Sequence, residues 1–561
     1  MKRFTLASLL AVAGCMASAG AAAQGLAATT LPGSAPAMRE LPPGGAGERA
    51  ALLLSAGAPP LASDANAPDL ISLRSFAALI AVADESVLTQ RYEAAIAEQG
   101  VRGAAAVFEP SFFANSDLDS SRAQNSSSEI LQRAGSADYA SRTAQLKSGI
   151  SVKAPTGADV ELSYNVARTT NSLQRSLGIT GAEFRSTVGA KLTQPLLRNG
   201  GVAVTNAAIR LAEREQQVAR ETLRQVVTQR VMEGVVAYLN VQRAAERVRL
   251  RTQASEIAGK LLAETRRQQS RGLKSSMDLQ DAESIVAQRR LQLAQAQQDY
   301  EEQVNSFQAM IAARERDSGS PLRARRTLPA DALALLADPH PGQARGIGAS
   351  VAGARESDAG GLGLSLARRP ELRVNQLKTE REDIRVEYAR NQMLPELSLT
   401  LRYGADDLAR SYRYPTQYPW LDAPYNSWAV GLQFRIYLSG DQKRQSDYQS
   451  AVIRRQQAGL AKLAVEQRIA NEVESSLQVL DRAMQQQGRQ QDNIHAQRAL
   501  LHIEESLVRE GRKSALDLMK RQLDVLVAEE ALADSIVIAN RASFIVSQAQ
   551  GNVLSRLGVE P

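Results

Sequence analysis

The chain has 561 residues, of which 23% are charged, 44% apolar and only 4% aromatic. So few aromatic side chains argue against several large globular cores, and the abundant Ala, Leu, Gln, Arg and Glu are typical of long helices and coiled coils. The net charge of +7 is too diffuse over this length to predict nucleic-acid binding, and the single cysteine excludes a disulfide framework.

The N-terminus has the form of a secretory signal peptide, expected over residues 1–23. A basic start at Lys2 and Arg3 precedes an apolar run that is too short to span a membrane as a helix. Two processing sites fit the pattern. One is cleavage before Gln24, and the other is a lipobox that makes Cys15 a lipid anchor. The mature chain is therefore expected to be exported, and residues 24–66, rich in Pro, Ala and Gly, to form an extended N-terminal segment.

Two parts of the chain, residues 67–312 and 366–557, repeat the same order of elements. Each is expected to contain a helix, strands, a long helix, a tight turn and a further helix. Residues 313–365 between them are rich in Arg, Ala and Gly and are expected to form a connector with a low-complexity insert.

The predicted helices pair by length. A long helix of about 70 residues, or about 105 Å, is expected between Gly200 and Gly272 and again between Gly440 and Gly511. The shorter helices, laid end to end, match the long ones in length; they are expected over 70–106 and 275–311, and over 367–394 and 514–556. In the second long helix, Leu460, Leu463 and Leu480 belong to an apolar seam with steps of three and four, which predicts a partner helix.

Strands are predicted between the first short helix and the long helix of each part. In the second part, residues 397–403 and 427–436 alternate apolar and polar side chains. The first part has strands at 111–118 and 184–192, the latter ending by Pro195, which cannot donate to a sheet. It also has about 45 extra residues, within which 150–162 predict an added hairpin that turns at Pro155-Thr156-Gly157.

Aromatic residues gather around the strands of the second part, including Tyr403, Trp420, Tyr425 and Trp428. In a membrane β-barrel such residues form girdles at the lipid interfaces. Packing of an ordinary sheet on a core is the alternative interpretation. With an export signal and long helices in the same chain, we favour the girdle.

The two tight turns carry a repeated motif, represented by Gly272, Ser275 and Asp278 in the first turn and by Gly511, Lys513, Ser514 and Asp517 in the second. The glycines suit the left-handed residue that ends a helix, and the serines suit the N-cap of the next. The aspartates then fall at the third helical position, as in a variant capping box. The motif lacks the glycines of a phosphate-binding loop, so a helical hairpin is expected.

No catalytic motif or metal-binding cluster is evident in the sequence, so we expect neither an enzyme nor a cofactor. The carboxylates are scattered at the spacing of solvated helix faces. One hypothesis that these observations leave open is a non-channel coiled-coil structural protein of the cell envelope.

The sequence resembles the TolC-like outer membrane efflux protein family over roughly residues 70–557. The resemblance rests on the duplicated layout, the two turn motifs and three short segments, Leu192–Gly200, Arg369–Leu372 and Leu394–Leu399. It implies a mainly α fold with a small β part, in which the helical hairpins form a periplasmic coiled-coil tunnel and three chains assemble an outer-membrane β-barrel of twelve strands. The added hairpin and the longer connector depart from that pattern.

The resemblance further implies a passive exit duct of a tripartite efflux or type I secretion system in a Gram-negative outer membrane. Its partners would be outer-membrane lipid, a periplasmic adaptor protein and an inner-membrane transporter, with no role for nucleic acid. In the family, acidic rings at the hairpin tips close the tunnel entrance. Asp278 and Asp517 match those positions, and Lys513 matches a basic gating partner.

Overall fold

The computed structural model describes residues 73–133, 135–176, 181–311, 366–409, 425–438, 440–510 and 512–559. All of them belong to one compact unit, Asp69–Pro561. The expected signal peptide, N-terminal segment and connector lie outside the described residues.

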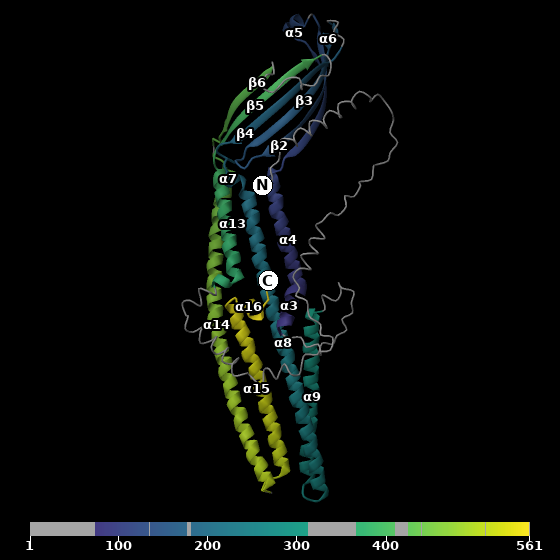
Figure 1. Ribbon diagram of the computed structural model, residues 1–561, viewed down its shortest axis with the longest axis vertical. Coiled ribbons are helices and arrows are strands. Elements are labelled where there is room, and N and C mark those ends of the chain that lie inside the picture. The colour runs from purple at the N-terminus through teal and green to yellow at the C-terminus, as the bar shows by residue number, and fades with distance from the viewer. Residues whose placement is uncertain are drawn as a thin grey trace, which may run out of the picture. The chain divides into compact units, whose positions relative to one another are not determined.

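One antiparallel sheet contains six strands in the order β1-β2-β3-β4-β5-β6 (Figure 1). The strands are β1 (Ser111–Gln124), β2 (Asp138–Lys153), β3 (Asp159–Asn171), β4 (Glu183–Pro195), β5 (Glu396–Ala409) and β6 (Asn426–Arg435). The added hairpin is therefore confirmed as β2 and β3, inserted between β1 and β4. Pro195 is the last residue of β4, as its missing N–H requires.

Helices make up most of the described chain. The first part contains α3 (Leu73–Ala83), α4 (Glu85–Ala105), η2 (Ala106–Phe108), α5 (Ser127–Gln132), α6 (Ser172–Ser176), α7 (Val202–Thr205), α8 (Ala207–Ser270) and α9 (Ser276–Ile311). The second contains α13 (Pro370–Gln392), α14 (Gln442–Arg509), α15 (Ala515–Ala549) and α16 (Val553–Leu557).

The pairing of short helices along long ones is confirmed. Helix α8, about 96 Å long by its 64 residues, packs against α3 and α4 and then against α9. Helix α14, with 68 residues, packs likewise against α13 and α15. Contacts of α8 with both α13 and α15 join the two repeats.

Three expected helices are interrupted, and of these the long helix of the first part is divided at Asn206 into α7 and α8. The first breaks at Asp84, whose side chain accepts hydrogen bonds from the backbone N–H groups of Ser86 and Val87 and so starts α4. The last breaks after Ala549, where Gly551 has a φ of 71°, in the left-handed region.

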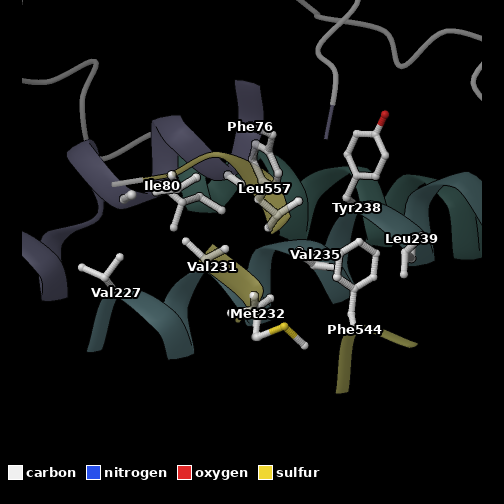
Figure 2. Close-up of a cluster of buried hydrophobic side chains, with 14 of the residues drawn as sticks. Phe76, Ile80, Val227, Val231, Met232, Val235, Tyr238, Leu239, Phe544 and Leu557 are labelled. Atoms are coloured by element: carbon white, nitrogen blue, oxygen red, sulfur yellow. The ribbon is translucent and has the colours of Figure 1, made fainter. Parts of the chain in front are cut away.

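The main hydrophobic core lies where α3, α8, α9, α15 and α16 meet (Figure 2). Phe76 is fully buried and stacks on Phe307, with ring centroids 4.3 Å apart. Gly234 of α8 faces α3 so closely that a Cβ there would lie 2.1 Å from Ile80 Cδ1. The missing side chain thus lets these two helices approach one another.

The apolar seam of α14 is only partly covered within the chain. Leu480 is buried against α15, whereas Leu460 and Leu463 are 68% and 60% exposed. A partner helix for the seam is therefore present over its second half only.

Candidate functional site

The first hairpin turn joins α8 to α9 and has the predicted capping geometry. Gly272 has a φ of 73°, in the left-handed region. The backbone N–H and the hydroxyl of Ser275 each donate to Asp278 Oδ2 at 2.9 Å, and the backbone N–H of Asp278 donates back to Ser275 Oγ at 3.2 Å. These bonds, with Lys274 nearby, hold the pKa of the Asp278 carboxyl below its usual value.

The second turn, between α14 and α15, is stabilised differently. Ser514 caps α15 by accepting from the backbone N–H of Leu516 at 3.2 Å. Asp517 is exposed, and its backbone N–H donates to the Ser514 carbonyl. No side-chain bond of Asp517 occurs among the residues that the structure describes, so the reciprocal box of the first turn is not reproduced here. Gly511 lies outside the described residues.

Glu504, one turn before the end of α14, is the centre of a charged cluster at this turn. Its Oε1 lies 2.8 Å from Lys513 Nζ and 3.3 Å from Arg521 Nε, and its side chain is 9% exposed. The hydrogen bond from Lys513, followed by that from Arg521, lowers the pKa of Glu504, which favours the ionised carboxylate. Lys513 is thus held by its own hairpin. Sequence reasoning missed Glu504, because a partner nine residues away across a turn leaves no periodic signal.

The two turns also differ in surface chemistry. Leu273 and Met277 of the first turn are 70% and 75% exposed. The equivalent residues of the second turn are Arg512, which is charged, and Leu516, which is buried. The first turn therefore presents an apolar surface and the second a charged one.

The sheet has one apolar and one polar face. Strand register fixes which residues share a face, since paired residues point to the same side. The apolar face carries Phe112 and Leu118 of β1, Leu146 and Ile150 of β2, Val160 and Leu162 of β3, Val188 and Leu192 of β4, Leu399 and Leu401 of β5, and Val430 and Leu432 of β6. Many of these side chains are exposed, for instance Phe112 at 62% and Leu432 at 67%.

Two of the aromatic residues singled out in the sequence, Tyr403 and Trp428, lie on this apolar face. Tyr403 of β5 pairs directly with Trp428 of β6, which is 76% exposed. Tyr425, just before β6, is 69% exposed. Trp420 and Cys15 lie outside the described residues.

The junction between sheet and helices is formed by two of the sequence segments named above. The buried Arg198 side chain donates to the Leu394 carbonyl at 2.9 Å and pairs with Glu396 at 2.8 Å. Asn199, with a φ of 61°, accepts from the side chain of Gln392. These bonds tie the end of β4 to the start of β5. These bonds give a structural role to residues of the two segments, Leu192–Gly200 and Leu394–Leu399, on which the family resemblance rests.

The third segment, Arg369–Leu372, lies at the start of α13 and contacts the helices of the second repeat. Arg369, at the start of α13, is buried and pairs with Glu472 of α14 at 2.8 Å. It also donates to the Gln548 carbonyl of α15 at 2.9 Å. One side chain therefore fixes three helices of the second repeat.

Within the described ranges, no helix is long and apolar enough to cross a membrane. Over the same residues, no group of three side chains suited to hold a metal ion is present.

Comparison with known proteins identifies the family. The model of the outer membrane efflux protein family matches residues 123–313 and 361–535, more than half of the chain, which therefore belongs to that family. No curated protein is significantly similar to it in sequence.

Solved structures share its fold. The chain aligns with a crystal structure of CusC at a TM-score of 0.55 and 15% identity, covering 85% of this chain and 92% of that one. The Campylobacter jejuni CmeC outer membrane channel aligns at a TM-score of 0.53 and 13% identity, with 86% of each chain covered. The outer membrane protein VceC of Vibrio cholerae aligns at 0.53 and 14% identity, covering 85% and 96%.

The resemblance inferred from the sequence is thus confirmed, and with it the mainly α fold with a small β part. The protein is an outer membrane efflux protein, and its family consists of channels, not enzymes. This assignment argues against the alternative of a non-channel structural protein.

Proposed function

We propose that this chain is the outer-membrane component of a tripartite efflux or type I secretion system, and that three copies form a passive exit duct across the periplasm and the outer membrane. One observation supports the proposal most directly: the same chain contains a sheet with an apolar and a polar face and two helices of 64 and 68 residues. The sheet suits a membrane exit, and the helices are long enough to cross much of the periplasm.

Assembly of identical chains is supported by the uncovered part of the α14 seam. Ile453, Leu460 and Leu463 are 60–68% exposed and lie on one side of the helix, at steps of seven and three. Such a stripe is unfavourable in water and is typical of a helix–helix interface. The neighbouring copy of the chain would cover it in a homotrimer.

Contact with outer-membrane lipid is supported by the apolar sheet face and by the aromatic side chains Tyr403, Tyr425 and Trp428. These residues fit a membrane girdle because an aromatic ring with a polar edge is favoured at the lipid interface.

The hairpin turns would form the periplasmic entrance, with Asp278 and Asp517 near the axis. In planar bilayers the protein should conduct, and Asp517→Asn should reduce its preference for cations, because aligned carboxylates attract cations into a narrow pore. Trimer stability should stay within about 0.5 kcal/mol of the wild type, since Asp517 makes no side-chain bond within the described residues.

Asp299→Asn on α9 removes an equal charge away from the turn and serves as the control. Absence of conductance in the unmodified protein would refute the channel. Unchanged selectivity in Asp517→Asn would refute the entrance assignment alone.

The first turn is the more favourable docking surface for a periplasmic adaptor. Its exposed Leu273 and Met277 offer apolar contacts that the second turn lacks. The double variant Leu273→Asp/Met277→Asp should abolish co-purification of the adaptor while bilayer conductance persists. Leu291→Asp, at a residue 60% exposed further along α9, is the matched control. Adaptor binding that survives the double variant would contradict this assignment.

A further inference from the structure

The sheet ends in two unpaired edges. Within the described residues, β1 pairs only with β2, and β6 pairs only with β5. All neighbours are antiparallel, so β1 and β6 run in opposite directions. Unpaired backbone groups at an edge are a template for another strand. The β6 edge of one copy can therefore pair with the β1 edge of the next without disturbing the antiparallel order.

In the half next to the helices, the added hairpin continues both faces of the sheet, and towards its far end Arg142 and Arg168 share the side of the apolar face. One row of paired residues on the apolar face runs Phe112, Ile150, Leu162, Ala190, Tyr403, Trp428. A row on the polar face runs Asn115, Lys147, Asn165, Thr187, Asp406. In the half next to the helices, the hairpin therefore has the same two-faced pattern as the strands on either side of it.

Two ion pairs lie on the polar face in the half of the hairpin next to the helices, whereas the pair Arg122–Asp138 lies on the apolar side at the far ends of β1 and β2. Lys147 pairs with Glu161 at 2.7 Å and Lys153 with Asp159 at 3.1 Å, and all four side chains lie on the polar face of β2 and β3. Charged groups of this kind are costly in lipid and are accommodated in a water-filled lumen.

The turn of the hairpin is fixed to the junction between sheet and helices. Gly157 has a φ of 92°, and a Cβ there would lie 2.6 Å from the Asn199 carbonyl oxygen. The Gly201 N–H donates to the Thr156 carbonyl at 3.1 Å, and the Thr156 hydroxyl donates to Gln194 Oε1 at 2.9 Å. The hairpin is thus held in line with the strands that lead into the helices.

We propose that β2 and β3 are membrane strands and that three copies close a barrel of eighteen strands, not the twelve that the family resemblance implies. Each edge of the sheet pairs with a neighbouring copy of the chain, so that β1 of one chain pairs with β6 of the next. The number of copies rests on the trimer of the proposed function.

Strand number sets the width of the exit. At about 4.8 Å between strands and a tilt of about 40°, eighteen strands give a barrel about 36 Å across, against about 24 Å for twelve. The cross-section is therefore roughly doubled, with the polar face lining the lumen.

Single cysteines test the placement of the hairpin. Gln145 and Thr400 lie on the polar face, and Leu146 and Leu401 lie on the apolar face, so β5 provides the matched control for β2. The only native cysteine, Cys15, is remote in sequence. In outer-membrane vesicles, a charged, water-soluble maleimide should label the variants Gln145→Cys and Thr400→Cys. It should fail to label Leu146→Cys and Leu401→Cys until the protein is denatured.

The outcomes separate the two proposals. Labelling at both 145 and 146, with alternation kept at 400 and 401, would overturn the eighteen-stranded barrel and leave the channel intact. Loss of alternation on β5 as well would overturn the membrane sheet itself.

Cross-linking and imaging test the closure. Cysteine pairs placed on the same face of β1 and β6, scanned around Asn115 and Ala429, should link chains up to a trimer, whereas mixed-face pairs such as Asn115 with Val430 should not. Electron microscopy of the trimer should show a barrel about 36 Å across. A barrel about 24 Å across would refute the proposal.

Discussion

Replacing Phe76 with alanine is expected to lower the free energy of unfolding by about 3–5 kcal/mol, the usual cost of removing a buried phenylalanine. Phe76 is fully buried, and its ring contacts Phe307 and lies 6.2 Å from the ring of Tyr238. Figure 2 shows Phe76 and Tyr238 within the core. Because these three rings come from α3, α9 and α8, the cavity would loosen three helices at once. The measurement is the thermal melting midpoint of detergent-solubilised protein.

Leu131→Ala is the control for Phe76→Ala. Leu131 lies on α5 and is 87% exposed, so its truncation should change stability by no more than about 0.5 kcal/mol. Equal midpoints for the two variants would show that the α3–α8–α9 core does not limit stability.

The elements themselves could be predicted from local sequence signals. Apolar repeats of three and four residues indicated the long helices, and period-two alternation indicated the strands. Pro195 marked the end of β4, and the Ser275–Asp278 spacing indicated the capping box that the structure shows. Each signal acts within a few residues, so it is visible in a single sequence.

Strand order could not be predicted in the same way. The hairpin of β2 and β3 was expected, but its position between β1 and β4 depends on pairing with other strands, for example of Ser111 with Ser151 and of Asp159 with Thr193. The contact of β4 with β5, for example Leu192 with Leu401, joins residues from different repeats. Such pairing is decided by tertiary packing, and alternation along one strand carries no information about its neighbour.

The candidate site was predicted in part. The turns and the aromatic residues were located from sequence, whereas Glu504 and the exposed pair Leu273 and Met277 were not. Comparing the two turns residue by residue offers a signal for the second case, since Leu273 is replaced by Arg512 in the other repeat. The same comparison gives no indication of Glu504, because burial of a carboxylate appears only in three dimensions.

Arg198→Met is expected to destabilise the junction between sheet and helices by about 3 kcal/mol, because removing one partner of a buried ion pair leaves the other without its counter-charge. The Arg198 side chain is 4% exposed and pairs with Glu396 at 2.8 Å, with Asp441 3.8 Å away. Glu396 is 37% exposed, and water there should keep the cost at the lower end of the range for buried pairs. The melting midpoint of the detergent-solubilised protein measures the effect.

Two further variants isolate the role of the guanidinium of Arg198. Arg198→Lys keeps the charge but loses the planar fork that reaches both the Leu394 carbonyl and Glu396, so its midpoint should fall between those of Arg198→Met and the wild type. Arg102→Met breaks the exposed pair with Glu98 and should cost no more than about 0.5 kcal/mol. Equal melting midpoints for Arg198→Met and Arg102→Met would contradict this prediction. The junction would then be held by backbone pairing alone, and the ion pairs of Arg198 would not contribute measurably to joining the sheet to the helices.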